Sequence, residues 1–392
     1  MNQVFAITLM NLRNLPARAG ASLVIVVGIA GVVAVVTALL SMAQGFQSTL
    51  KGSGDPARAF VLRGGSDTEM SSFISTEAYR IIESKPGVMR DAQGPLAAGE
   101  TYVIADVPKR GNNSPANMPL RGVEPASFRV RPEVRIIEGR NLEFGRLELI
   151  AGAKAANQFQ GLEVGQAINI RGANWQVVGL FTANGGIHEG EVWVDNTVLV
   201  SNLNRGGSGY TSMIVRLEAP EELDPFALAL ENDRRLETKV VRETTYYSEQ
   251  SEGLTGLITN FGYSIGLIMA FGAIFGALNT MYSAVSTRSV EIATLRAIGF
   301  GPTPIVVSVM VEALVLAVLG GAIGGGIAYL FFNGYTASTM GDTFSQVSFD
   351  FRVTPDLLVR GIIWSCLLGL IGGLFPSIAA ARQPVVTALR GL

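Results

Sequence analysis

Long stretches without any charged side chain are the feature that most constrains how this sequence can fold. Residues 19–50, 253–287 and 361–381 contain no Asp, Glu, Lys or Arg, and Glu312 is the one charged residue within 297–341. A helix of about 20 apolar residues crosses the hydrocarbon core of a bilayer. Each of the four stretches is long enough, so the sequence predicts a polytopic membrane protein with four transmembrane helices.

Basic side chains are sorted toward one side of the predicted membrane. The segment between the first two spans carries 22 basic and 27 acidic residues, whereas cytoplasmic loops carry a Lys/Arg excess close to the helix ends. Such basic residues flank the other helix ends: Arg13, Arg18, Arg288, Arg296, Arg382 and Arg390. We therefore expect a multi-pass protein of the bacterial inner (cytoplasmic) membrane, with both N and C termini in the cytoplasm and the large segment outside.

The spans set the predicted order of the chain. It is a cytoplasmic amphipathic lead (1–20) that turns at Pro16, a first transmembrane helix (21–42), a periplasmic domain (43–253), a second transmembrane helix (254–286), a cytoplasmic connector (287–301), a third transmembrane helix (302–332), a periplasmic loop (333–355), a fourth transmembrane helix (356–381) and a cytoplasmic tail (382–392). The first span is expected to be a retained helix, because its apolar run is longer than the core of a cleaved signal peptide.

In the outer domain, some segments show the hydrophobic periodicity of β-strands and others show that of α-helices. Apolar residues two apart predict strands around 168–170 and 213–217, and a helical spacing predicts a helix over 75–84. The dipeptide Asp224-Pro225 is typical of a helix start. The fold class is thus an α-helical membrane protein with a large mixed α+β extracytoplasmic domain between helices one and two. Since Cys366 is the only cysteine, that domain has no intrachain disulfide.

Glycines at close helical spacing stand out in the second and third spans. A pair four residues apart lets two helix backbones approach closely in lipid. The predicted packing positions in the second and third spans are Gly272, Gly276, Gly320, Gly321, Gly324 and Gly325, with Gly326 beside them. Whether they pack within one subunit or between two subunits stays open at this point.

Glu312 is a candidate functional residue because an ionisable group inside a span is costly. A proton relay would need further Asp, His or Lys residues inside the other spans, and the stretches 19–50, 253–287 and 361–381 contain none. We favour a hydrogen bond to another helix, or an anchor at the interface.

Catalytic chemistry has little support in this sequence. His188 is the only histidine, and its place after Asn184-Gly185-Gly186 predicts a solvent-exposed loop residue. No metal site is expected, and no Gly-rich phosphate-binding loop ending in Lys-Ser/Thr occurs. We expect a non-catalytic chain without cofactors. If ATP is used, a partner binds it.

The connector at 287–301 is the most informative segment. Arg288 and Glu291 lie three residues apart, so they face together on a helix. A narrow apolar face suited to a groove in another protein follows from the spacing of Ile292, Leu295, Ile298 and Gly299. An ordinary amphipathic connector fits the spacing equally well.

The run Thr-Arg-x-x-Glu-Ile-x-x-x-Arg-Ala-Ile-Gly at 287–299 resembles the coupling-helix signature of MacB/FtsX-type ABC transporter permeases, which include the LolC and LolE type. Segments 85–88, 139–140, 149–152 and 383–390 resemble that family in the same order along the chain. The resemblance implies that a separate cytoplasmic ABC ATPase docks on this helix. The docking residues would be Arg288, Glu291, Ile292, Leu295, Arg296, Ile298 and Gly299.

The resemblance also implies a dimer, formed with a second copy or with a paralogue, and mechanotransmission of ATP-driven movement to a MacB-like periplasmic core domain. Export or efflux with a periplasmic adaptor protein is the function we favour. The alternatives are a lipoprotein-releasing permease and an FtsX-like activator of a cell-wall hydrolase. Membrane lipid is an expected partner, and nucleic acid is not.

Overall fold

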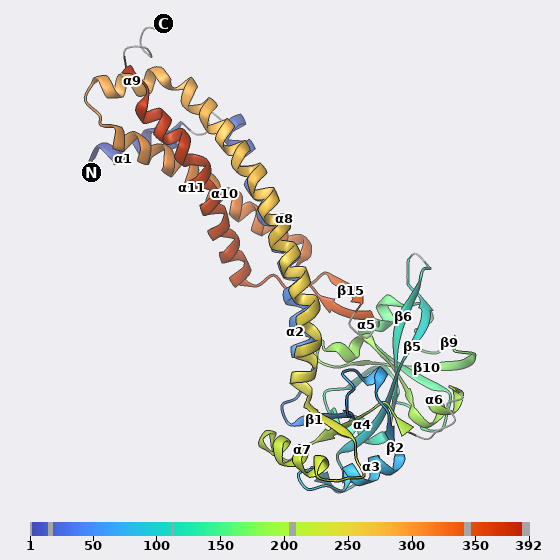
Figure 1. Cartoon of the computed structure of the whole chain (residues 1–392). Coiled ribbons are helices and arrows are strands. Elements are labelled where there is room, and N and C mark those ends of the chain that lie inside the picture. Colours follow the sequence, from blue (N-terminus) through green and yellow to red (C-terminus); the bar gives the residue numbers. More distant parts are fainter. Residues whose placement is uncertain (1, 15–18, 112, 204–208, 341–345, 386–392) are drawn as a thin grey trace. The chain divides into compact units, whose positions relative to one another are not determined.

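A computed structural model describes residues 2–14, 19–111, 113–203, 209–340 and 346–385 of the chain (Figure 1). The predicted turn at Pro16 and the last residues of the predicted tail lie outside these ranges. The chain divides into two compact units. The helical unit comprises residues 1–44, 256–335 and 351–392, and the α+β unit comprises residues 45–255 and 336–350.

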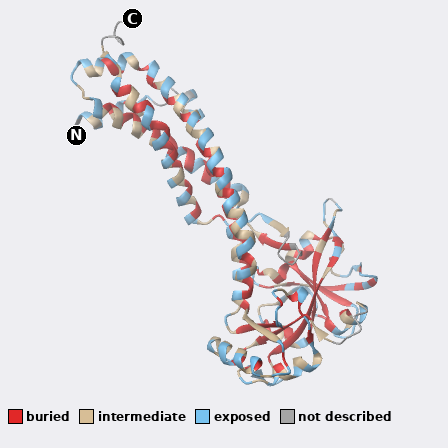
Figure 2. Cartoon of the chain, in the orientation of Figure 1, coloured by how far each residue is buried: buried red, intermediate tan, exposed pale blue. Residues whose placement is uncertain are grey.

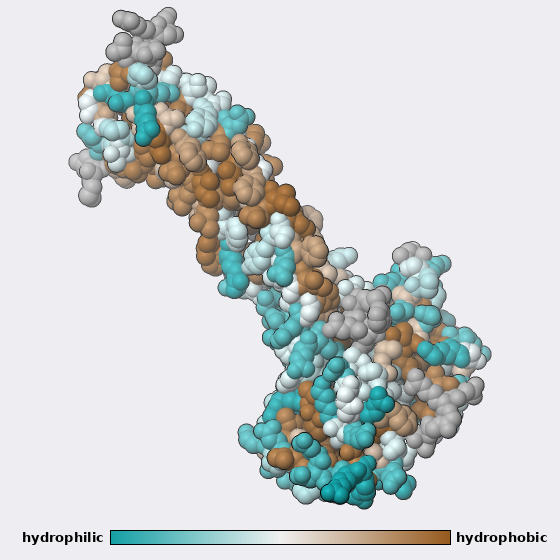
Figure 3. All heavy atoms as spheres, in the orientation of Figure 1, coloured by the Kyte–Doolittle hydropathy of each residue, from teal (hydrophilic) through white to brown (hydrophobic). Residues whose placement is uncertain are grey.

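Four apolar helices in the described part of the chain are long enough to cross a membrane. They are α2 (Ala19–Lys51), α8 (Glu243–Thr287), α10 (Pro302–Phe332) and α11 (Pro355–Arg382). Helix α2 continues past residue 42 and α8 begins well before residue 254, because hydropathy marks only the apolar part of each helix. The outward side chains of the helical unit are mainly hydrophobic (Figure 3), as expected of a surface in contact with lipid.

Two short helices complete the helical unit: α1 (Asn2–Arg13) and α9 (Ser289–Ala297). Helix α1 packs against α10, and the amide of Asn11 donates a buried hydrogen bond of 2.7 Å to Ser308 Oγ. The apolar core of this unit joins side chains of α2, α8, α9, α10 and α11.

Glycines set how closely α10 approaches its neighbours. A Cβ on Gly320 would meet Val26 O of α2 at 2.9 Å, and one on Gly324 would meet the Ala30 backbone of α2. Gly321 faces Ser365 and Gly325 faces Leu358, both on α11. These four glycines therefore pack within the subunit. A Cβ on Gly272, Gly276 or Gly326 would meet no atom within 4 Å.

The α+β unit is built on a ten-stranded mixed sheet with the strand order β14-β1-β13-β5-β6-β11-β8-β10-β7, in which β9 pairs with β10. Its strands are β1 (Arg58–Arg63), β5 (Ala97–Pro108), β6 (Pro115–Val123), β7 (Arg135–Gly139), β8 (Glu148–Gly152), β9 (Ala167–Ile170), β10 (Ala173–Thr182), β11 (Val192–Asp195), β13 (Ser212–Arg216) and β14 (Thr238–Arg242). Short strands form separate pairs: β2 (Ile74–Ser75) with β12 (Gly209–Tyr210), and β3 (Arg90–Asp91) with β4 (Gly94–Pro95).

Helices cover this sheet. They are α3 (Thr76–Glu83), α4 (Pro125–Val130), α5 (Ala153–Gln158), α6 (Asn196–Asn202) and α7 (Leu223–Glu231), with 3₁₀ turns η2 (Glu69–Ser71), η3 (Ile187–Gly190) and η4 (Pro220–Glu222). The buried residues follow the strands (Figure 2).

Strand β5 connects the two halves of the sheet. Its residues 97–100 pair with β13, and its residues 101–108 pair with β6. One apolar core lies beside the β1–β13 half and includes side chains of α3 and α7. A second core lies beside the β6–β8–β10 half and includes side chains of α5 and α6. Strand β5 therefore changes its partner on going from Glu100, which pairs with β13, to Thr101, which pairs with β6.

Most of the local predictions for this unit are confirmed. Strands β9 and β13 lie where apolar residues alternate, and the hydroxyl of Ser75 caps α3 by accepting from Ala78 N at 3.1 Å. A helix does start at the predicted place, but α7 begins at Leu223, directly after η4, so Asp224 lies in its first turn and Glu222 takes the N-cap position.

The segment predicted as a periplasmic loop over 333–355 contains a hairpin of β15 (Thr336–Met340) and β16 (Gln346–Asp350). Residues 336–350 belong to the α+β unit. Phe349 is fully buried and its ring meets Phe46 edge-on at 5.4 Å, while Asp350 pairs with Lys154 at 3.4 Å. Contacts distant in sequence hold this hairpin, which is why local periodicity did not identify it.

The glycine contacts predict opposite effects for two neighbouring substitutions. Gly324→Ala should destabilise the protein by about 1–3 kcal/mol, because the new methyl group is forced against the Ala30 backbone. Gly326→Ala should be neutral or stabilising by up to about 1 kcal/mol, because it restricts the unfolded chain and meets open space. Thermal unfolding in detergent micelles measures both, and equal effects would contradict the packing of α10 on α2.

Candidate functional site

Helix α9 is the candidate site of the helical unit, and a glycine ends it. Gly299 has a φ of 102°, a left-handed conformation that favours glycine. Phe300 N donates to Leu295 O at 3.1 Å and Gly299 N donates to Arg296 O at 3.2 Å. This pattern closes a helix and turns the chain. Gly299 therefore shapes the connector.

The start of α9 is held to α10 by a buried ion pair. Arg288 Nη2 donates to Glu312 Oε2 at 2.9 Å, and both side chains are less than 5% exposed. Arg288 Nε also donates to Ala284 O of α8 at 3.2 Å. Glu312 thus makes a hydrogen bond to a residue outside its own helix, the first of the two roles expected from the sequence.

The end of α9 is held to α11. Arg296 Nη1 donates to the backbone oxygen of Gln383 at 2.7 Å, and Gln383 is the C-cap of α11. A guanidinium there satisfies a carbonyl at the negative end of the helix dipole. The two arginines of α9 therefore bind its ends to two different long helices.

The exposed face of α9 differs from the predicted one. Arg288 and Ile292 are buried at 3% and 6% exposure, and Leu295 and Arg296 are half-buried. The outward face is instead formed by Val290, Glu291, Thr294, Ala297 and Ile298, of which Ile298 is 68% exposed. Ile292 packs inward because it completes the apolar core between α8 and α10. Of the residues predicted for docking, Glu291, Ile298 and Gly299 are exposed.

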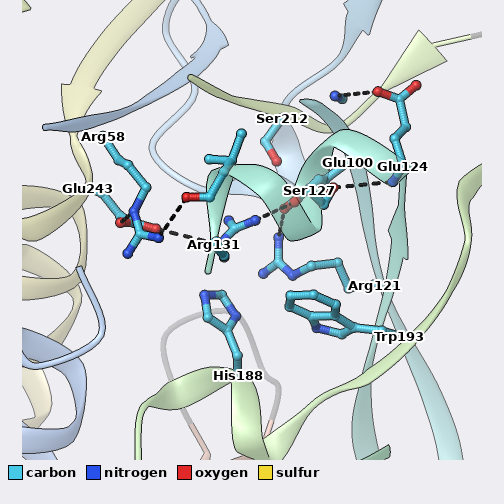
Figure 4. A network of polar contacts seen from close by, with 12 residues as sticks. Arg58, Glu100, Arg121, Glu124, Ser127, Arg131, His188, Trp193, Ser212 and Glu243 are labelled. Atoms are coloured by element: carbon cyan, nitrogen blue, oxygen red, sulfur yellow. Dashed lines mark hydrogen bonds and ion pairs between the residues drawn. The ribbon is translucent and has the colours of Figure 1, made fainter. Parts of the chain in front are cut away.

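The α+β unit contains a network of buried charges that sequence reasoning missed (Figure 4). Arg121 of β6, 1% exposed, lies at its centre. Its guanidinium bonds Glu69 at 2.8 Å, Glu100 at 2.9 Å and Glu191 at 2.8 Å. Its carbon Cζ also lies 4.9 Å from the centre of the Tyr102 ring.

The network continues from Glu100 to the first residue of α8. Glu100 also accepts from Arg131, at the end of α4. Arg131 Nε lies 3.7 Å from Oε1 of Glu243. The other oxygen of Glu243 accepts from Arg58 Nε of β1 at 2.6 Å. The carboxylate of Glu243, at the start of α8, is therefore held between two arginines.

His188 belongs to this network, so the prediction of a solvent-exposed residue is wrong. Its side chain lies in η3 with 1% exposure. Nδ1 is 3.1 Å from Glu191 Oε2 and Nε2 is 3.4 Å from the Tyr247 hydroxyl of α8. Trp193 Nε1 donates to the same Glu191 oxygen at 2.8 Å. The loop folds inward because Glu191 accepts from three different side chains.

The guanidinium groups keep the buried carboxylates ionised. Burial alone would raise the pKa of Glu191, but Arg121 and His188 more than offset this and hold its pKa well below the usual value. Burial also acts to raise the pKa of Glu100, but Arg131 and Arg121 outweigh it and lower that pKa.

The network joins the two halves of the sheet to the start of α8. Glu100 lies where β5 changes neighbours, Arg58 belongs to the first half and Arg121 to the second. Among the described residues, no group of three or more His, Cys, Asp or Glu is arranged to hold a metal ion. The sequence did contain a signal: Glu100 and Arg121 lie inside otherwise apolar strand segments, where an isolated charge needs a partner.

The Arg288–Glu312 pair predicts that substitutions of its two residues have non-additive effects on the free energy of unfolding. Arg288→Gln and Glu312→Gln should each destabilise the protein by about 3–5 kcal/mol, because each leaves one buried charge without its partner. The double variant should lose less than the sum, since it leaves neither charge. Unfolding in detergent micelles gives the four free energies of this cycle. The exposed pair Asp356–Arg360 (2.8 Å) is the control, with an expected coupling of about 0.2–1 kcal/mol. Strict additivity for Arg288 and Glu312 would contradict the pairing.

The Arg121 network predicts a pH dependence. Because the folded-state pKa values of Glu100 and Glu191 are lowered, their contribution to stability is present above the unfolded pKa and is lost as the pH falls below about 4.5. Arg121→Met should destabilise the protein by about 3–5 kcal/mol at pH 7, and by less at pH 4 because protonation relieves the stranded carboxylates.

Tryptophan fluorescence of the α+β unit reports this unfolding, since Trp193 lies in the network. Arg110→Gln, which removes an exposed pair with Glu163, should change stability by less than about 1 kcal/mol at either pH. A pH-independent loss in Arg121→Met would show that packing, and not charge, explains its effect.

Two sequence-family models cover most of the chain. One, described as a MacB-like periplasmic core domain, matches residues 22–233, which is more than half of the sequence. The other, described as the FtsX-like permease C-terminal domain, matches residues 263–385 and includes α9, α10 and α11.

Individual relatives are distant, with identities of 24–26%. An uncharacterized ABC transporter permease of Methanocaldococcus jannaschii is 24% identical over 263 residues, spanning 65% of each chain. The uncharacterized ABC transporter permease YvrN of Bacillus subtilis is 24% identical over 401 residues, spanning 93% of each chain. The macrolide export ATP-binding/permease protein MacB of Psychrobacter cryohalolentis is 26% identical over 152 residues, which is 38% of this chain and 22% of that protein. With a MacB-like periplasmic core domain after its first apolar helix and an FtsX-like permease domain behind it, the chain belongs to the MacB/FtsX family of ABC transporter permeases.

Proposed function

We propose that this chain is the membrane subunit of an ABC transporter whose ATP is hydrolysed by a separate ATPase, and that α9 is the helix on which the ATPase docks. The exposure of Val290, Glu291, Thr294 and Ile298, on a helix whose opposite face is buried, is the observation that supports this most directly. A short helix that presents an apolar residue beside a carboxylate suits a groove in a partner protein.

The contacts of α9 provide a route for movement within the helical unit. Displacement of α9 would act on α10 through Arg288 and Glu312, and on α11 through Arg296. Helices α2 and α8 each begin in one unit and end in the other. The first residue of α8, Glu243, is held by Arg58 and Arg131. In this mechanotransmission, no substrate needs to cross between the helices.

The basic residues near α1, α9 and the end of α11 support a cytoplasmic location for these elements and for both termini, in a bacterial inner membrane. The α+β unit then lies in the periplasm. We further propose that the permease works as a dimer, with a second copy or a paralogue. The MacB relative is named as a macrolide export protein, which favours efflux for this chain too. We propose that a periplasmic adaptor takes part.

Affinity purification of the tagged protein in mild detergent, with mass spectrometry of the bound proteins, tests this assignment. We expect an ABC ATPase together with a periplasmic adaptor. An ATPase recovered with a cell-wall hydrolase would replace export with hydrolase activation, and one recovered with lipoproteins would indicate lipoprotein release. Recovery of no ATPase from a preparation that stays dimeric would contradict the proposal.

The exposed face of α9 predicts the sites at which docking can be broken. Ile298→Asp and Glu291→Lys should each abolish co-purification of the ATPase and stimulation of its ATP hydrolysis, because they place a new or reversed charge in the contact. The folded permease should keep its thermal midpoint, since both side chains are exposed. Leu228→Asp is a matched control, because Leu228 is 56% exposed on α7 of the α+β unit. An ATPase that stays bound to Ile298→Asp would contradict docking on this face.

A further inference from the structure

The buried network of the α+β unit holds more carboxylates than guanidinium groups. Within the part of the chain that the structure describes, its ion pairs join three arginines to four glutamates, each less than 5% exposed: Arg58, Arg121, Arg131, Glu69, Glu100, Glu191 and Glu243. With all four carboxylates ionised, these groups carry one negative charge in excess. An uncompensated charge is costly to bury, so the network needs one more positive charge.

His188 is placed to supply that charge (Figure 4). Its Nδ1 lies 3.1 Å from Glu191 Oε2, and its Nε2 lies 3.4 Å from the hydroxyl oxygen of Tyr247. An imidazolium donates a hydrogen bond from both ring nitrogens. Both neighbouring atoms can accept one, since the first is a carboxylate oxygen and the second a hydroxyl oxygen.

The other charged groups near η3 favour a cation at His188. Its neighbour Glu189 is a further buried carboxylate, held by a hydroxyl and two backbone N–H groups, all of them neutral donors. On the described elements that pack against η3, charged side chains pair with each other: Lys154 of α5 with Asp350 of β16 at 3.4 Å, and Glu148 of β8 with an arginine at 2.6 Å. The charge left uncompensated around His188 is therefore negative.

Glu243, the first residue of α8, is the least completely bonded of the four carboxylates. Its Oε2 accepts from Arg58 Nε at 2.6 Å and from Asp55 N at 2.9 Å. Its buried Oε1 has no hydrogen bond among the described residues, and Arg131 Nε lies 3.7 Å away. Both oxygens of Glu69, Glu100 and Glu191 accept hydrogen bonds. Added negative charge would therefore displace Glu243 first.

We propose that His188 is protonated in the folded chain as the fourth cation of this network, and that loss of its proton loosens the first turns of α8. Without the proton, the excess negative charge stays in the buried network and repels the Glu243 carboxylate toward water. The folded chain then holds a proton that the unfolded chain releases, so stability falls as the pH rises through the range of this release. The inference does not depend on ATPase docking.

Nuclear magnetic resonance of the full chain in micelles, labelled with ¹⁵N histidine, reads this charge directly. His188 is the only histidine, so both ring signals belong to it. At pH 7.5 an ordinary histidine, with a pKa of about 6.5, is roughly nine-tenths neutral. We expect His188 to show two protonated ring nitrogens at this pH. A neutral ring at pH 7.5 would overturn the proposal.

Glu69→Gln separates the charge of the whole network from the local contact with Glu191. Glu69 bonds Arg121 and Ser212 and has no bond to His188. Because the variant leaves three carboxylates against three guanidinium groups, His188 should release its proton at a pH about one unit lower than in the wild type. Glu163→Gln, which removes an exposed pair with Arg110, is the control and should leave the titration unchanged. An unchanged titration in folded Glu69→Gln would contradict the charge count.

Hydrogen exchange with mass spectrometry tests the link to α8. After correction for the intrinsic effect of pH, residues 243–251 should exchange about tenfold faster one pH unit above the measured release of the proton than one unit below it. His188→Gln has no proton to lose and should show no such difference, and α3 should show none in the wild type. Equal exchange of residues 243–251 at both pH values in the wild type would refute the loosening of α8.

Discussion

The cost of burying a charge controls both units of this permease. A charge removed from water loses several kcal/mol of solvation, which only a partner of opposite sign with good geometry can offset. In the helical unit this cost leaves long uncharged spans and one buried pair, Arg288 and Glu312. In the α+β unit it produces the opposite solution, in which Arg121 is surrounded by Glu69, Glu100 and Glu191.

Each of the two sets of buried charges lies where separate helices or strands are joined. The Arg288 pair fixes the connector α9 to α10, while its outward face stays exposed. The network around Arg121 lies where β5 exchanges one neighbour for another and where α8 begins. A hydrophobic contact at these places would tolerate sliding, whereas hydrogen-bonded charges have one favourable arrangement. In the mechanotransmission proposed above, movement of α9 or α8 would act on elements that these charges hold in one arrangement.

Small residues complement the charges in the helical unit. Helices in lipid gain little from hydrophobic burial against one another, so close backbone contact supplies much of their packing. Gly320 and Gly324 provide it between α10 and α2, Gly266 provides it between α8 and α2, and Gly361 provides it between α11 and α2.

The sequence by itself determined the four apolar helices, the α+β domain after the first of them, the strands β9 and β13, and the family. The helices, the domain and the strands follow from composition and local periodicity, which the chain carries whatever its tertiary structure. The family follows from short motifs that resemble those of known permeases. Only the tertiary structure decided which face of α9 is exposed, that His188 is buried against Glu191, and that β15 and β16 belong to the α+β unit. Each of these depends on partners far away in the chain, and a charge inside a strand, such as Glu100 or Arg121, does not reveal which opposite charge will meet it.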